Sequence, residues 1–116
     1  MVMPEFHQLC SDAKKEIQEI GPDDLKKMQG AREDFVLVDI REPNEVAQGT
    51  IPGAVPVTRG VLERDIDQVT TDKNKKIVLY CAGGSRSALA AASLKKMGFK
   101  NAISLAGGYG GWKKSV

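Results

Sequence analysis

Short apolar runs alternate with amphipathic stretches along this chain, and they predict its secondary structure. Five segments have the length of strands, and they comprise residues 17–20, 35–38, 54–57, 77–80 and 102–105. Two of them, 35–38 and 77–80, are continuously apolar, which is typical of strands covered on both faces of a sheet. Pro56 has no amide hydrogen to donate to a neighbouring strand, so we expect the segment around it to lie at a sheet edge.

Helical patterns lie between these segments. Apolar residues recur at intervals of three and four over residues 6–13, which predicts a helix within an N-terminal extension, residues 1–16. In residues 87–97 the pattern places Ala90, Leu94 and Met97 on one inward face. Shorter helices are predicted over 22–30, from Pro43 toward a cap at Gly49, over 61–69, and after Gly107.

Strands and helices that alternate in this way predict an α/β domain with a mainly parallel sheet. In such sheets, sites form beyond the carboxyl ends of the strands, near a switch in strand order. Two strand ends carry polar residues: Asp39 and Arg41 follow one strand, and a loop beginning at Cys81 follows another. We therefore expect these two groups to be neighbours.

Cys81 stands between a buried strand and the N-terminus of a helix. Gly83 and Gly84 let the intervening backbone curl tightly. Unpaired amide groups and the helix dipole at such a position stabilise an anion. They should hold a thiolate equally well, lowering the pKa of a cysteine from about 8.5 to roughly 3.5–7.5. The pattern predicts a reactive cysteine in an anion-binding loop.

Composition narrows the function classes. The chain has 116 residues, which suits one domain spanning 1–116, and its net charge of +2 gives no support for nucleic acid or an anionic membrane as a partner. Without a signal peptide or a membrane span, a cytoplasmic location is expected. Two cysteines and one histidine do not match a zinc site. Cys10 is better explained as a small buried hydrophobe than as a resolving cysteine.

Four stretches in order resemble the rhodanese family of single-domain sulfurtransferases, from about residue 20 to residue 112. They are residues 36–45, 49–54, 81–87 and 105–112. The resemblance implies a three-layer α/β/α domain with a five-stranded parallel sheet of order 3-2-4-5-1, and its edge third strand agrees with Pro56. At position 50 this chain has a threonine where members of the family commonly have a histidine. Ala82 and Gly83 replace the basic residue that some thiosulfate-using members carry after the cysteine.

For function, the resemblance implies that Cys81 is the catalytic nucleophile and carries a persulfide. Sulfur would come from thiosulfate or a low-molecular-weight persulfide and go to a thiol or cyanide, with no metal or organic cofactor. The implied partners are these small molecules, and a protein that accepts the sulfur is left open as a further partner. The implied substrate-binding loop consists of Ala82, Gly83, Gly84, Ser85, Arg86 and Ser87.

The supporting residues allow more than one interpretation. Arg86 either attracts an anionic donor or braces the loop against Asp39, and bracing is favoured. Asp39 is expected to be a structural acceptor that fixes the loop. Arg41 and Arg59 either guide anions at the rim or are solvated surface residues. Ser87 either donates its hydroxyl to the sulfur or caps the helix.

The resemblance also leaves three other classes of function to consider. Tyrosine phosphatases and arsenate reductases of this fold have five residues between the cysteine and the arginine, whereas four separate Cys81 from Arg86. The loop also lacks an aspartate to act as general acid. Non-catalytic interaction modules often lack the cysteine. A persulfide carrier that serves a protein partner would use the same Cys81 chemistry and stays open.

Overall fold

A five-stranded, all-parallel sheet forms the centre of the molecule in a computed structural model that describes residues 2–116. Its order is β1-β5-β4-β2-β3, which confirms the predicted order 3-2-4-5-1. Pro56 lies in the edge strand, as its missing amide hydrogen requires. The strands are β1 (Gln18–Ile20), β2 (Val36–Asp39), β3 (Val55–Pro56), β4 (Ile77–Tyr80) and β5 (Ala102–Leu105).

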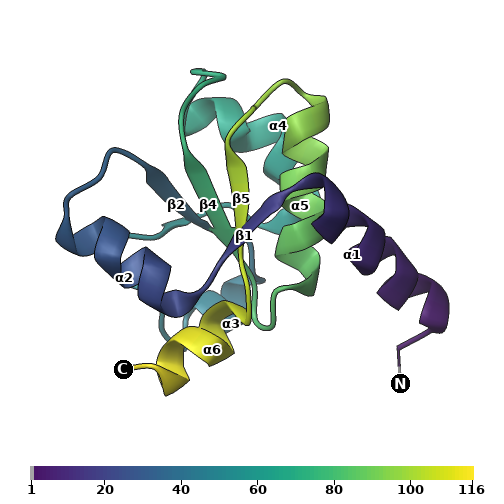
Figure 1. Ribbon diagram of the computed structural model, residues 1–116, viewed down its shortest axis with the longest axis horizontal. Helices are drawn as coiled ribbons and strands as arrows, with labels where there is room; N and C mark the ends of the chain where they lie inside the picture. Colours follow the sequence, from purple (N-terminus) through teal and green to yellow (C-terminus); the bar gives the residue numbers. More distant parts are fainter. Residues whose placement is uncertain (1) are drawn as a thin grey trace.

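Helices cover both faces of this sheet, which confirms the three-layer α/β/α architecture (Figure 1). One face is packed by α1, α4 and α5, and the other by α2 and α6 (Figure 1). The helices are α1 (Pro4–Glu16), α2 (Pro22–Gly30), α3 (Pro43–Val46), α4 (Leu62–Asp65), α5 (Ser85–Lys96) and α6 (Gly108–Lys114). Two single 3₁₀ turns, η1 (Arg59–Val61) and η2 (Ile66–Gln68), flank α4.

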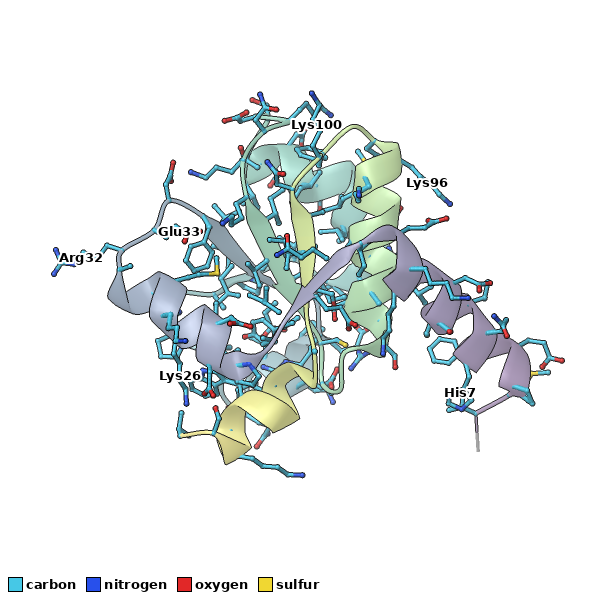
Figure 2. All side chains as sticks on the ribbon, in the orientation of Figure 1. His7, Lys26, Arg32, Glu33, Lys96 and Lys100 are labelled. Atoms are coloured by element: carbon cyan, nitrogen blue, oxygen red, sulfur yellow. The ribbon has the colours of Figure 1, made fainter. Side chains whose placement is uncertain are left out.

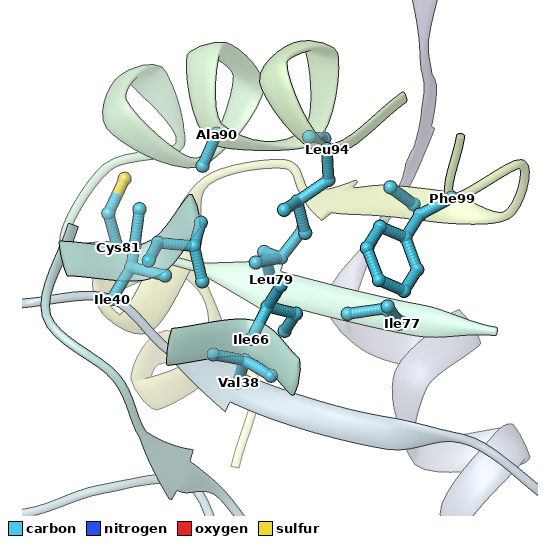
Figure 3. Packing of buried hydrophobic residues seen from close by; sticks show 12 residues of the cluster. Val38, Ile40, Ile66, Ile77, Leu79, Cys81, Ala90, Leu94 and Phe99 are labelled. Atoms are coloured by element: carbon cyan, nitrogen blue, oxygen red, sulfur yellow. The ribbon is translucent and has the colours of Figure 1, made fainter. Parts of the chain in front are cut away.

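Side chains of the central strand β4 alternate between two separate cores. Ile77 and Leu79 pack toward α5, where Ala90 and Leu94 meet them (Figure 3). Val78 and Tyr80 point to the opposite face and join the core beneath α2 and α6. Because successive strand residues face opposite sides, neighbours in the sequence enter different layers. This alternation decides which polar groups can meet beyond the strand ends.

Two apolar side chains that belong to the predicted helical patterns are exposed, Met97 in residues 87–97 and Leu9 in residues 6–13. Met97 is 39% exposed because α5 ends at Lys96 and the chain turns away through Gly98, whose φ is +99°. Leu9 is 59% exposed, although Cys10 in the same turn is buried against α5. The N-terminal end of α1, which carries His7, projects away from the body of the molecule (Figure 2).

The predicted helix over residues 61–69 is divided. Only Leu62–Asp65 is α-helical, and 3₁₀ turns precede and follow it. Leu62 and Ile66 are nevertheless buried in the core beneath α5, as the apolar pattern requires. Among residues 2–116, no helix combines the length and the apolar composition needed to cross a lipid bilayer.

Candidate active site

Cys81 lies directly after β4 and is nearly buried, with 1% of its surface exposed. Three residues, Ala82 to Gly84, connect it to α5, and Gly84 adopts a φ of +99° that places its amide toward the sulfur. Figure 3 shows the Cys81 sulfur pointing toward α5. The tight turn therefore brings the thiol to the N-terminus of a helix, as the sequence predicted.

Three hydrogen-bonding groups surround the Cys81 sulfur. The amides of Gly84 and Ser87 donate to Sγ over 3.1 and 3.4 Å, and the Ser87 hydroxyl oxygen lies 3.5 Å from it. No side chain caps α5, so the sulfur itself accepts the amide of the helix's third residue, as an N-cap oxygen would. Ser87 is thus directed at the sulfur and is not the cap.

These contacts outweigh the effect of burial on the thiol. Burial raises the pKa of Cys81, but hydrogen bonds from Ser87, Gly84 and Gly83 stabilise the thiolate and lower the pKa below its usual value. The deprotonated sulfur is the nucleophilic form of cysteine. The site consequently favours the form of Cys81 that attacks an electrophilic sulfur or phosphorus.

A second serine lies behind the first. The hydroxyl oxygens of Ser87 and Ser104 are 2.8 Å apart, and both residues are fully buried. Ser104 belongs to β5, in which the other residues are apolar. Sequence reasoning missed Ser104, although a single hydroxyl in a buried apolar strand was a visible signal.

The start of α6 holds the loop from its other side. The amides of Tyr109 and Gly110 donate to the carbonyl oxygens of Cys81 and Ala82 over 2.8 and 3.1 Å. Gly108 has a φ of +56°, and a Cβ on it would lie 2.5 Å from the Cys81 carbonyl oxygen. The sequence pointed to this glycine-rich stretch only as a motif, without its role as a support for the loop.

Arg86 braces the loop, but its partner is not the expected one. Its guanidinium nitrogens lie 3.1 and 3.2 Å from the two carboxylate oxygens of Glu45 in α3. The predicted pairing with Asp39 is wrong, because Asp39 faces the opposite side of the sheet. The Glu45 carboxylate also holds the pKa of Arg86 above its usual value.

Asp39 and Arg41 form a buried ion pair beneath α6, and within residues 2–116 neither side chain hydrogen-bonds to the Cys81 loop. Arg41 donates to both Asp39 oxygens and to the Gly49 carbonyl, and its guanidinium lies 4.2 Å from the centre of the Tyr109 ring. The expectations that Asp39 fixes the loop and that Arg41 lies at the rim or in solvent are both wrong. Strand alternation places Asp39 beside Tyr80, on the face opposite Cys81.

Replacing Tyr80 with phenylalanine should lower the free energy of unfolding by about 1–3 kcal/mol. The Tyr80 hydroxyl donates to Asp39 over 2.7 Å and accepts the Ile51 amide over 3.1 Å, and all three residues are buried. Both partners would lose a buried hydrogen bond. Urea denaturation measures the change. Tyr109→Phe, in the neighbouring stacked ring, is the control, and an equal loss in both variants would contradict this account.

Arg59 and Cys10 lie on the α5 side of the sheet. The Arg59 guanidinium pairs with Glu63 over 2.9 Å and lines a groove between α1 and α5 with a volume of about 400 Å³. The hydrogen bonds that the Arg59 side chain makes within residues 2–116 go to Glu63 and not to the Cys81 loop. Cys10 is buried, with Sγ 3.9 Å from the Ser85 carbonyl oxygen, in keeping with a small packed residue.

Comparison with known proteins identifies relatives across nearly the whole chain. The family model of the rhodanese-like domain matches residues 21–115. A sulfurtransferase of Allochromatium vinosum is 34% identical over 98 residues, which cover 84% of this chain and 90% of that protein. A putative sulfurtransferase of Bacillus subtilis is 38% identical over 98 residues, with 84% and 92% covered.

A solved structure from Rhodopseudomonas palustris shares the fold almost entirely. It is 35% identical, with a TM-score of 0.89, and the match covers 99% of this chain and 93% of that chain. That protein is described as one of unknown function and a possible tyrosine phosphatase. The descriptions of these relatives thus name two activities, sulfur transfer and, for the Rhodopseudomonas palustris protein, a possible tyrosine phosphatase.

Proposed function

Because this chain belongs to the rhodanese-like sulfurtransferase family, we propose that it transfers sulfane sulfur through a persulfide on Cys81. The observation that carries the proposal is the set of donors around Sγ, namely the amides of Gly84 and Ser87 and the Ser87 hydroxyl. These groups stabilise negative charge on Sγ, as an oxyanion hole does on oxygen, so they favour the thiolate that attacks a donor and the thiolate that leaves when the sulfur is handed on.

The reaction has two displacement steps. The Cys81 thiolate attacks the outer sulfur of a persulfide donor, the donor's S–S bond breaks, and the donor leaves as a thiolate. A new S–S bond on Cys81 carries the transferred sulfur, so the enzyme alternates between a free and a loaded form. An acceptor thiolate then attacks this outer sulfur, becomes a persulfide itself and releases the Cys81 thiolate. With cyanide as the acceptor, the product is thiocyanate.

The ion pairs of the three candidate arginines support a low-molecular-weight persulfide over thiosulfate as the donor. Arg86 is paired with Glu45, Arg41 with Asp39 and Arg59 with Glu63. Each arginine that could attract a dianion already faces a carboxylate. Cys81 is also 1% exposed, so a donor must lose water as it approaches, which costs most for a doubly charged ion.

Removing the charge of Glu45 should shift this donor preference. In a Glu45→Gln variant, Arg86 keeps a hydrogen-bond acceptor but loses its counter-charge, so thiosulfate should be attracted more strongly. We expect kcat/KM for thiosulfate to rise about three- to tenfold relative to that for glutathione persulfide. The gain should shrink as salt is added. Steady-state kinetics with both donors measures the ratio.

Glu33→Gln is the matched control for this experiment. It makes the same change in net charge, but Glu33 pairs with Lys76, and these residues precede β2 and β4 at the amino edge of the sheet, away from Cys81. An equal gain in both variants would show a general effect of net charge. An unchanged donor ratio in Glu45→Gln would contradict the role given to the Arg86–Glu45 pair.

The proposed function is tested by loading the purified, reduced protein with sulfur. The protein is incubated with glutathione persulfide or with thiosulfate, and its intact mass is measured. We expect one added sulfur that cyanide removes, and none after iodoacetamide has blocked Cys81. If neither donor adds sulfur while Cys81 still reacts with iodoacetamide, the proposal is wrong. A loaded protein that yields sulfur to cyanide but not to glutathione would indicate a protein acceptor.

Phosphatase activity is the second candidate, because of the Rhodopseudomonas palustris relative. Two features of this chain disfavour it. Only four residues separate Cys81 from Arg86, and the Arg86 guanidinium binds Glu45 instead of turning into the loop. Hydrolysis of p-nitrophenyl phosphate, lost on alkylation of Cys81 and accompanied by no sulfur loading, would establish this activity in place of sulfur transfer.

A further inference from the structure

Ser104 carries a buried hydroxyl that lies within hydrogen-bonding distance of another buried serine hydroxyl. Among residues 2–116, the fully or nearly buried polar and charged residues are Asp39, Arg41, Ser87 and Ser104. Asp39 and Arg41 form an ion pair with each other. The hydroxyl oxygens of Ser87 and Ser104 lie 2.8 Å apart. The only buried hydroxyl partner of Ser104 is therefore the residue whose own hydroxyl lies beside the Cys81 sulfur.

The position of Ser104 in the sheet explains how it reaches Ser87. Ser104 is in register with Leu79 of β4, two residues before Cys81, and lies on the same face of β5 as Ala102, toward α5. Ala102 shows that a methyl group is enough to pack against the core on this face, so packing alone does not require a hydroxyl at Ser104. A hydroxyl here adds a polar group that requires a hydrogen bond, and Ser87 supplies it.

The number of protons sets the direction of this short chain of hydrogen bonds. A serine hydroxyl has one proton and two lone pairs. When Cys81 is a thiolate, the Ser87 proton must point to the sulfur, so the hydrogen between the serines comes from Ser104. Ser104 then donates to Ser87, and Ser87 donates to Sγ. Without Ser104, no side chain on that side holds the Ser87 hydroxyl in this orientation, and it is free to turn away from the sulfur.

We propose that Ser104 is a positioning residue that orients the Ser87 hydroxyl toward the Cys81 sulfur. The inference rests on the proposed function and deepens it, because the same orientation would stabilise the thiolate before loading and after release of sulfur. Ser104 acts through Ser87 and does not touch the sulfur itself. Hydrogen bonds linked in this way strengthen one another in a buried site.

The test is the pH dependence of alkylation of Cys81 by iodoacetamide, followed at this residue by peptide mass spectrometry. In Ser104→Ala we expect the midpoint to move to higher pH, with alkylation about fivefold slower below the midpoint and an unchanged plateau above it. Ser104→Thr keeps the hydroxyl and should keep the wild-type midpoint. Ser93→Ala removes another α5 hydroxyl, one that binds Glu63, and should change nothing.

Three outcomes would overturn the inference. They are an unchanged midpoint in Ser104→Ala, an equal shift in Ser104→Thr, and a plateau that falls as much as the rate at low pH. The last two would indicate altered packing instead of a lost hydrogen bond. Alkylation needs no sulfur donor, so it is independent of the proposed function. A shifted midpoint in a protein that never loads sulfur would leave the inference standing and remove sulfur transfer.

Discussion

Serine in place of Cys81 should abolish sulfur loading and reduce turnover to the uncatalysed level, while the protein stays folded. A serine hydroxyl is not ionised near neutral pH and has no thiolate to attack sulfur. Its oxygen can still accept the amides of Gly84 and Ser87, so the loop and the start of α5 should persist. Intact mass after exposure to donor and the rate of thiocyanate formation measure the loss.

Circular dichroism and urea denaturation of Cys81→Ser are the control for folding. Sulfur loading that persists in this folded variant would move the chemistry to Cys10, the other free cysteine among residues 2–116.

In the wild-type protein, the rate at which iodoacetamide alkylates Cys81 should rise with pH and level off once Cys81 is deprotonated. Because hydrogen bonding lowers the pKa of Cys81, the midpoint should lie below the value of about 8.5 for an unperturbed cysteine. A midpoint at or above that value would contradict the role assigned to the loop.

Replacing Gly108 with alanine should reduce turnover by about a hundredfold, because it displaces the loop that holds Cys81. An added Cβ would lie 2.5 Å from the Cys81 carbonyl oxygen and 2.7 Å from backbone atoms of Ala82. These are backbone atoms, so no side chain can rotate to relieve the clash. A φ of +56° adds strain of about 1–3 kcal/mol for a residue with a Cβ. Donor kinetics and urea denaturation measure both effects.

Gly111→Ala is the matched control in the same helix. A Cβ at Gly111 would lie 3.8 Å from its nearest neighbour, the Ala106 carbonyl oxygen, and the backbone there needs no positive φ. This variant should keep the wild-type turnover and gain up to about 1 kcal/mol in helix stability. If Gly108→Ala turned over as fast as Gly111→Ala, the start of α6 would have no part in supporting the loop.

Local patterns in the sequence predicted most of the fold and the reactive residue. Continuous apolar runs marked β2 and β4, and Pro56 marked the sheet edge, because each depends on the chemistry of a few adjacent residues. Cys81, followed by two glycines and a helix, was predicted as a nucleophile on the same local grounds. The order of the strands came from the resemblance to a family and not from these patterns.

The partners of the charged side chains could not be predicted in this way. Asp39 ends β2 and Cys81 directly follows β4, and these strands pair in register, which suggested a shared site. Strand alternation nevertheless sends Asp39 to the α6 face and Cys81 to the α5 face. Arg86 met Glu45 because α3 lies against the loop, a contact between residues 41 positions apart.

The sequence by itself determined which segments are strands, the turn whose backbone amides point inward, and the thiol within that turn, since each follows from residues close together along the chain. The tertiary structure alone decided which groups support that thiol. Ser104 and Gly108 come from β5 and α6, and only the packing of these elements against the loop brings them to Ser87 and to the Cys81 backbone. Contacts over such distances depend on the orientation of whole elements, which no short stretch of sequence contains.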